Sequence, residues 1–275
     1  MNPAYIIPRV IRHFLPDSLV RFLLRRSLII RPGLETRSPF EAADRYIEAM
    51  NEEGFSILDK KILVFGYGGS YAVACMLLKK GAAHVTLCEK EAPPDDRRNQ
   101  ALLVEFSQYL MEKEGKVSPN PDFITLAQGD IRKILTGSEF DIILSTSVFE
   151  HLDDVEGITR ALERLTSPQG IHLHYVDLRD HFFKYPFEML CYSAKTWYGW
   201  LNPTSHHNRW RLPDYQRLFS SLFDQSKIIV LERDYPAFQK IVHRIHPEFI
   251  SGDAEIDAVT LIKIMAKIPS NKAIH

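Results

Sequence analysis

Cysteine is scarce in this chain of 275 residues, and the positions of the three cysteines exclude several kinds of site. Cys75, Cys88 and Cys191 have neither the paired spacing of a zinc site nor that of a disulfide framework. No three-cysteine cluster for radical chemistry is present either. Two of the cysteines fall in apolar segments that we expect to be core elements. The sequence therefore predicts reduced thiols in a cytoplasmic protein.

Net charge and long apolar runs are also missing. The formal net charge is −1, so no overall basic field favours nucleic acid as a partner. No uninterrupted apolar stretch is long enough to span a bilayer, and charges interrupt any signal-peptide core. With 45% hydrophobic and 25% charged residues, the composition is that of an ordinary globular protein. One large α/β domain with an extension accounts for the length.

Lysine is absent from residues 1–37, which carry seven arginines against only two acidic residues. Apolar residues lie between the arginines in two amphipathic segments that meet near Pro16, and this pattern predicts two short helices. A capping sequence at Ser38 and a glycine stop at Gly54 then predict a third helix. We expect residues 1–54 to form a helical extension packed on the main domain, residues 55–275. The alternative is that the basic segment lies on an anionic membrane surface.

A glycine-rich turn follows the first apolar strand of the main domain. The turn comprises Gly66, Gly68 and Gly69, and a helix-forming segment follows it at once. Glycines let the main chain approach a ligand closely, and a helix N-terminus presents free N–H groups. A second apolar strand ends at Glu89, about 20 residues further on, where a carboxylate can hold ribose hydroxyls. The segment therefore predicts a nucleoside-type ligand.

Strand and helix patterns alternate beyond this turn. We expect strands over residues 60–65, 84–89, 123–127, 140–145 and 170–176, with helices over 95–113 and from 154 to 165. Apolar strands that alternate with helices indicate a parallel sheet covered on both faces, a doubly wound Rossmann-like α/β fold.

The C-terminal part of the chain breaks this alternation. Residues 178–212 are dense in aromatic residues and histidines without a clear period, which predicts an inserted lid. The β-rich segments 227–231 and 258–266 have only an expected loop between them. They therefore predict an antiparallel hairpin at one edge of the sheet.

Four motifs, in order, resemble those of the class I S-adenosylmethionine-dependent methyltransferases, over about residues 60–267. They are the glycine turn, the acidic residue Glu89, Asp130 after the third strand, and the loop from Ser145 to Leu152. The resemblance implies a seven-stranded, mostly parallel sheet with an antiparallel terminal hairpin, and S-adenosyl-L-methionine as the cofactor. It also implies that Asp130 contacts the adenine. The cofactor-binding residues that it implies are Gly66, Tyr67, Gly68, Gly69, Glu89, Asp130, Ile131, Ser145 and Ser147.

Two positions depart from the pattern of that family. Val64 stands where the family has an acidic residue that helps to hold the methionine ammonium, and Ser70 replaces the third glycine. Serine is a good helix cap, so the turn is retained. The departures leave open a non-catalytic adenosyl-ligand or partner-binding module. An NAD-dependent oxidoreductase is another alternative, although its third glycine would fall at Tyr71, where a ring hinders helix packing.

Two histidines are candidate general bases for the methyl transfer. His151 and His181 follow the fourth and fifth strands, at the sheet edge where ligands bind in such folds. After the fourth strand the chain lacks the Asn/Asp-Pro-Pro-Tyr and Pro-Cys motifs of enzymes that act on nucleic-acid bases. We therefore expect in-line methylation of oxygen or nitrogen in a small organic acceptor, and no nucleic-acid partner.

Substrate contacts and metal ligands complete the expected site. Candidate substrate residues are Glu150, Arg179, Trp197, Trp200 and Arg209. Glu150 could instead hydrogen-bond its own loop, which we favour, and the aromatic residues could equally form the core of an inserted subdomain. Neither His172 with His174 nor His206 with His207 has the spacing of a metal motif, so we expect no metal.

Overall fold

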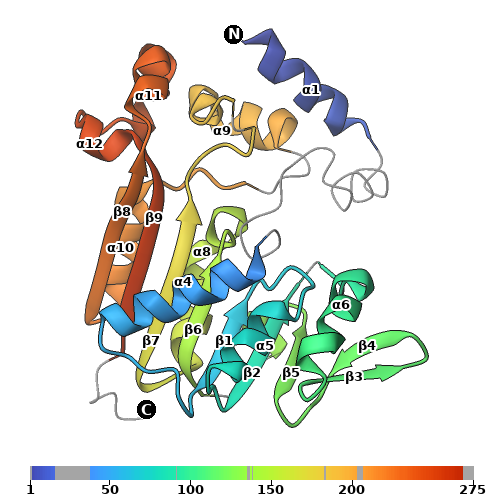
Figure 1. Cartoon of the computed structure of the whole chain (residues 1–275). Helices are drawn as coiled ribbons and strands as arrows, with labels where there is room; N and C mark the ends of the chain where they lie inside the picture. The colour runs from blue at the N-terminus through green and yellow to red at the C-terminus, as the bar shows by residue number, and fades with distance from the viewer. Residues whose placement is uncertain are drawn as a thin grey trace.

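A seven-stranded sheet forms the centre of the protein, shown in Figure 1 as a computed structural model that describes residues 2–15, 38–90, 92–134, 137, 139–182, 184–202 and 207–268. Its strand order is β5-β2-β1-β6-β7-β9-β8. The strands are β1 (Lys61–Phe65), β2 (His84–Glu89), β5 (Ile124–Gln128), β6 (Phe140–Thr146), β7 (Thr166–Asp177), β8 (Gln225–Arg233) and β9 (Val259–Lys267).

The first five strands are parallel, and β9 is antiparallel to both β7 and β8. The predicted doubly wound sheet with an antiparallel terminal hairpin is therefore confirmed. From β1 the chain adds strands first towards one edge of the sheet, β2 and β5, and then towards the other, β6 and β7. In such sheets, ligands bind beyond the carboxyl ends of the strands at the point between β1 and β6 where this change occurs.

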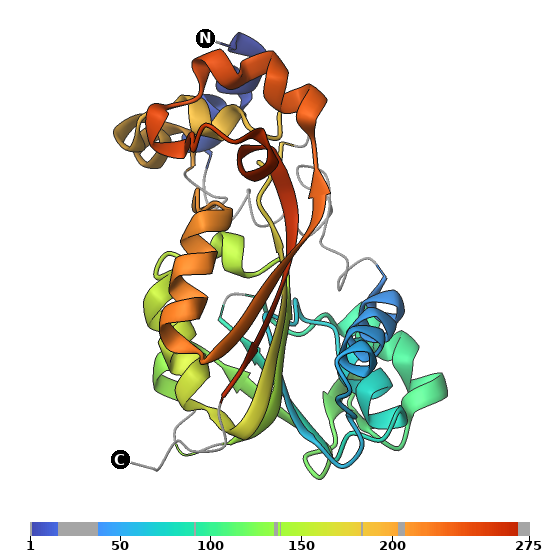
Figure 2. The ribbon, with the colours of Figure 1, turned by 90° about the vertical axis from the view of Figure 1, so that its left-hand side faces the viewer.

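Helices cover both faces of the sheet (Figure 2). Ile62 and Val64 of β1 belong to one apolar core, whereas Leu63 and Phe65 belong to the other, as alternation along a strand requires. The first core is closed by α4 (Pro39–Glu52), α5 (Ala72–Lys79) and α6 (Asp96–Phe106). The second is closed by α7 (Ile131–Ile134), α8 (Val155–Arg164) and α10 (Leu212–Leu222).

Two expected elements differ from the structure. The helix expected over residues 95–113 ends at Phe106, and β3 (Leu110–Lys113) and β4 (Lys116–Pro119) form a separate hairpin. Glu114 and Gly115 between them both have positive φ, 54° and 74°, which matches the twist of a two-residue hairpin loop. The expected loop between the last two strands instead contains α11 (Tyr235–Ile241) and α12 (Ala254–Asp257). Both expectations were wrong because these short elements are stabilised by packing against distant segments, which local sequence patterns do not report.

A third apolar core lies beyond the carboxyl ends of the strands, at the top of Figure 1. We call this part of the protein the cap; it comprises residues 3–13, 178–211 and 234–258 as far as they are described. Its helical elements are α1 (Pro3–His13), η2 (Glu188–Cys191), α9 (Ala194–Thr196), η3 (Trp197–Leu201), α11, η4 (Val242–Arg244), η5 (Pro247–Phe249) and α12. The segment predicted as an inserted lid thus shares a packed core with α1 and with the region between β8 and β9.

Helix α1 contributes Tyr5 and Arg9 to the cap and leaves Ile7 and Ile11 exposed on its other face. Arg9 forms an ion pair with the buried Asp180. The second helix expected before residue 37 lies outside the described residues. Within the described part of the chain, every helix is too short or too polar to cross a membrane.

Candidate active site

The glycine turn after β1 is held by close contacts on two sides. Gly66 has φ +80°, and a Cβ there would lie 2.3 Å from Val148 Cγ2, in the loop after β6. Gly69 has φ +85°, and its Cβ would lie 2.5 Å from the carbonyl oxygen of Pro93. Any larger residue would combine left-handed strain with a clash. Glycine is therefore required at both positions by the packing of the protein itself.

Asn99 of α6 fixes the same turn and was not predicted from the sequence. Its amide donates to the carbonyl oxygen of Gly69 at 3.0 Å, and its side-chain oxygen accepts from the Tyr71 N–H at 2.9 Å. The side chain is fully buried. A polar residue on the buried face of a helix was the available signal, because such a group needs a hydrogen-bond partner.

Glu89 lies beside the turn at the end of β2. One carboxylate oxygen accepts from the Gly68 N–H at 3.2 Å, and the other accepts from the Lys90 N–H at 2.9 Å. The side chain is only partly buried, so its acceptor oxygens can also face a ligand. The spacing of glycines and acid in the sequence thus corresponds to real proximity.

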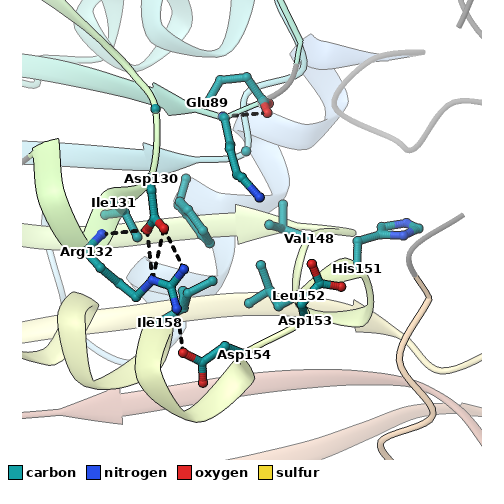
Figure 3. Close-up of a pocket in the computed structure, with 14 residues that line it drawn as sticks. Glu89, Asp130, Ile131, Arg132, Val148, His151, Leu152, Asp153, Asp154 and Ile158 are labelled. Atoms are coloured by element: carbon teal, nitrogen blue, oxygen red, sulfur yellow. Dashed lines mark hydrogen bonds and ion pairs between the residues drawn. The ribbon is translucent and has the colours of Figure 1, made fainter. Parts of the chain in front are cut away.

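A cavity of about 330 Å³ opens at this edge of the sheet (Figure 3). It lies beyond the carboxyl ends of β1, β2, β5 and β6, where the sheet topology places a ligand. Five of the predicted site residues line it: Gly66, Glu89, Asp130, Ile131 and His151. Lining residues that the sequence analysis missed are Phe65, Lys90, Gly129, Arg132, Val148, Leu152, Asp153, Asp154 and Ile158.

Arg132 binds the carboxylate of Asp130 on the wall of this cavity. Its Nε lies 2.9 Å and 3.1 Å from the two carboxylate oxygens, and its own backbone N–H donates to one of them. These hydrogen bonds lower the pKa of Asp130 to about 2. Arg132 also donates to Asp154 at 2.6 Å, so one guanidinium joins two loops of the cavity.

The other expected cofactor residues do not line the cavity. The buried Tyr67 packs against Tyr71, with ring centroids 6.3 Å apart. Ser145 lies inside β6, where its hydroxyl is 2.8 Å from His174 Nδ1. Ser147 follows β6 with φ 56°, and its N–H donates to Tyr175 O.

His151 and His181 do lie together. Their ring centroids are 4.6 Å apart, and His207 of the cap lies 5.3 Å from the first and 4.7 Å from the second. Burial lowers the pKa of His181 well below the usual value and lowers that of His207 to about 4. Glu150 lies under this group with 1% exposure, and burial raises its pKa. His181 and His207 are therefore neutral at physiological pH.

The expected substrate residues in the cap are mostly engaged elsewhere. Arg179 donates to Asp177 at 2.7 Å and 2.9 Å, and lies 3.5 Å from Glu232. Trp197 is fully buried and donates to His207 O, while the buried Arg209 donates to Tyr192 O at 2.5 Å. Trp200 is 52% exposed beside His13. For Trp197 and Arg209 the structure corresponds to the alternative reading, the core of an inserted subdomain.

Comparison with known proteins identifies the domain. Residues 66–174 match the model of a methyltransferase domain family, and this stretch includes the glycine turn, Glu89, Asp130 and the loop after β6. Over these residues the chain is similar to methyltransferase domains. This match indicates S-adenosyl-L-methionine as the cofactor, as the sequence predicted. No match to a curated protein was found for the chain.

Solved methyltransferase structures share the fold of this domain. A protein proposed to be a sarcosine dimethylglycine methyltransferase, from Galdieria sulphuraria, superposes with a TM-score of 0.55 at 15% identity, covering 93% of this chain and 99% of that one. The plantazolicin methyltransferase BpumL, solved with S-adenosylhomocysteine, gives 0.52 at 11% identity and 96% coverage of both. Phosphoethanolamine N-methyltransferase 2 from Haemonchus contortus gives 0.51 at 14% identity, covering 82% and 53%. At these identities the likeness concerns the fold alone.

Proposed function

We propose that this methyltransferase transfers the methyl group of S-adenosyl-L-methionine to an oxygen or nitrogen of a small organic acceptor. One observation carries the proposal: Glu89, Asp130, Ile131 and His151 line a single cavity at the switch point of the sheet. In this proposal, the first three residues contact the nucleoside of the cofactor, and the histidine accepts the proton of the acceptor.

For the cofactor, we propose that Glu89 accepts hydrogen bonds from the ribose hydroxyls. The adenine would lie beside Ile131, with Val148 and Leu152 as apolar contacts. The Asp130 carboxylate is hydrogen-bonded to Arg132. We therefore propose that Asp130 supports the adenine site partly by fixing Arg132 in the wall of the cavity. Val64 is fully buried in the sheet and offers no carboxylate to the methionine ammonium. The nucleoside end is therefore expected to supply most of the affinity.

The reaction is an in-line displacement at the methyl carbon. The acceptor atom forms its bond to the methyl group while the sulfur–methyl bond breaks and sulfur keeps the electron pair. S-adenosylhomocysteine is the product, and the acceptor proton passes to His151. Alignment of the two reactants contributes about 7–11 kcal/mol to such reactions. A positioned base adds roughly a hundred- to ten-thousandfold in rate.

The proposed acceptor is small because the cap lies over this edge of the sheet, as both ribbon views show. The Galdieria and Haemonchus proteins are named for small amines. We therefore propose a panel of small amines, phenols and carboxylic acids as the first acceptors to test.

Calorimetric titration with S-adenosylhomocysteine and with NADH tests the proposal. We expect binding of S-adenosylhomocysteine only, and at least about tenfold weaker binding in Glu89→Ala, because a carboxylate hydrogen bond contributes about 1.5–3 kcal/mol. Glu112→Ala is the matched control, since Glu112 lies on the separate β3–β4 hairpin. Binding of NADH alone would reverse the assignment to an oxidoreductase.

A further inference from the structure

Four side chains with metal-ligating atoms meet between the cavity and the cap. Glu150 and His151 belong to η1 (Phe149–His151), His181 follows β7, and His207 belongs to the cap. The ligand atoms of Glu150, His151 and His181 all lie within 4.8 Å of one another. The ring of His207 stands nearly perpendicular to that of His181, at 84°, with centroids 4.7 Å apart.

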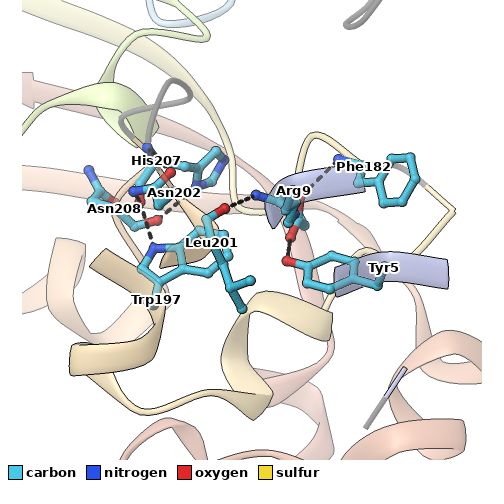
Figure 4. Close-up of polar contacts among 9 residues, drawn as sticks. Tyr5, Arg9, Phe182, Trp197, Leu201, Asn202, His207 and Asn208 are labelled. Atoms are coloured by element: carbon cyan, nitrogen blue, oxygen red, sulfur yellow. Dashed lines mark hydrogen bonds and ion pairs between the residues drawn. The ribbon is translucent and has the colours of Figure 1, made fainter. Parts of the chain in front are cut away.

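His207 is oriented by a backbone carbonyl. Its Nδ1 lies 2.7 Å from Asn208 O, and because a carbonyl can only accept, the proton is on Nδ1. Its Nε2 therefore carries a lone pair, and this buried atom meets no hydrogen-bond geometry, although the Arg179 backbone also faces the ring. The segment around it is fixed by Asn202 and Trp197, which both donate to His207 O (Figure 4). An imidazole held by a carbonyl on one nitrogen and free on the other is arranged like a metal ligand.

Glu150 is the second unsatisfied group. Neither carboxylate oxygen meets hydrogen-bond geometry, although the Ser147 side chain and the backbone N–H groups of Glu150 and Asp177 face it. His181 Nε2 lies 3.9 Å from one oxygen. A carboxylate that is removed from water without a cation destabilises the folded protein. A bound cation would remove this penalty.

We infer that Glu150, His151, His181 and His207 form a binding site for a divalent transition-metal ion of the zinc type. Three neutral imidazoles and one carboxylate suit a borderline-soft cation rather than magnesium or calcium, which prefer oxygen ligands. In a tetrahedral zinc site with bonds of 2.0–2.1 Å, ligand atoms stand about 3.4 Å apart. The ligand atoms of Glu150, His151 and His181 lie within 4.8 Å of one another, so the side chains, His207 included, would have to move inward to bind an ion.

The expectation of no metal rested on the short spacings within His172–His174 and His206–His207. The present set comes from three separate segments, so no local spacing could reveal it. The inference goes beyond the proposed function, because ion binding requires no methyl donor. Since His151 also lines the cavity, an ion here would hold an acceptor oxygen and lower its pKa. With the ion bound, an acceptor hydroxyl would lose its proton to solvent before the transfer, and His151 would serve as a ligand and not as the base.

Calorimetric titration of zinc into the full chain, free of any affinity tag and stripped with a chelator, tests the site. We expect one equivalent per chain, and at least about tenfold weaker binding in Glu150→Gln and in His207→Asn, the size of effect seen when a zinc site loses support. His243→Asn is the control, because His243 is exposed and outside the group. Cobalt substituted for zinc should give the intense visible absorption of a tetrahedral site, lost in the same variants.

Three outcomes would overturn the inference. These are no zinc binding by the wild-type chain, equal binding in both ligand variants, or equal loss of binding in the His243→Asn control. Circular dichroism establishes that each variant is folded, and His151→Asn replaces any variant that is not. Titration of the same samples with S-adenosylhomocysteine separates the two proposals. Zinc binding without binding of S-adenosylhomocysteine would contradict the proposed methyltransferase function and support the metal site.

Discussion

Two groups of histidines in this protein differ in their hydrogen bonding. His172 and His174 lie on β7 inside the sheet, whereas His151, His181 and His207 meet at the edge of the cavity. Both groups contain rings within about one ring diameter of each other. What separates them is that His207, in the second group, has a buried ring nitrogen without a hydrogen-bond partner.

The sheet pair forms a saturated chain of hydrogen bonds. Thr166 donates its hydroxyl proton to Leu162 O, so it must accept from His172 Nε2 at 2.7 Å. His172 Nδ1 then accepts from His174 Nε2 at 3.2 Å, and His174 Nδ1 accepts from the Ser145 hydroxyl at 2.8 Å. Each ring carries one proton, and all four nitrogens are used. Such a pair has no capacity left for a ligand.

The group at the cavity leaves buried acceptors unused. His207 Nε2 and both Glu150 oxygens lack partners in hydrogen-bond geometry. Buried polar groups without a partner lower the stability of a folded protein unless a ligand, an ion or water binds them. The comparison teaches that the residual bonding capacity of a histidine, more than its proximity to another, distinguishes a structural ring from a functional one.

Replacing a histidine of the cavity group should lower turnover strongly without changing the stability of the protein. We expect His151→Ala to lower kcat by about a hundred- to ten-thousandfold, because the acceptor proton loses its destination. Release of S-adenosylhomocysteine across the acceptor panel measures this, with His243→Ala as the control. Binding of S-adenosylhomocysteine and the thermal midpoint should stay unchanged. Full turnover in His151→Ala would remove the histidine from the mechanism.

Replacing a histidine of the sheet pair should lower the free energy of unfolding without removing the residues of the cavity. We expect His174→Ala to destabilise the protein by about 2–4 kcal/mol, because it leaves a cavity and deprives Ser145 and His172 of their partners. Urea unfolding measures the change. Unaltered stability together with lost zinc binding would break the distinction between the two groups.

Acid should sharpen the distinction further. Burial lowers the pKa of His172 to about 3 and that of His174 well below its usual value, whereas the unfolded chain titrates near 6.5. Below that pH the unfolded state binds more protons, so stability present above pH 6.5 falls as the pH drops towards 3. The slope is about 1.4 kcal/mol per pH unit for each histidine. Urea unfolding at several pH values should show a shallower slope in His172→Gln/His174→Gln than in wild type. Identical slopes would show that the pair is protonated in the folded state.

The sequence was sufficient for the sheet and for one side of the cavity. The alternation of apolar strands with helices predicted the parallel sheet, and the lack of an expected crossover helix predicted the terminal hairpin. The spacing of the glycines and the acid predicted that Gly66 lies near Glu89. His172 and His174, which alternate along one strand, are both fully buried in the sheet and hydrogen-bonded to each other.

The remaining parts depend on contacts between distant segments. Asn99 reaches the glycine turn from 30 residues away, and His207 approaches His181 through the fold of the cap. Arg132 was missed because its role requires two acidic partners on different loops. Side chains that act across segments have no periodicity or fixed spacing to reveal them.

The ion pair of α1 has a consequence for this edge of the sheet. Arg9 reaches Asp180, also donates to Leu201 O at 2.7 Å, and its guanidinium lies over the Trp197 ring. Asp180 is the immediate neighbour of His181 along the backbone. Through Arg9, the first helix therefore holds the backbone directly before His181 and ties the N-terminal segment to the cap.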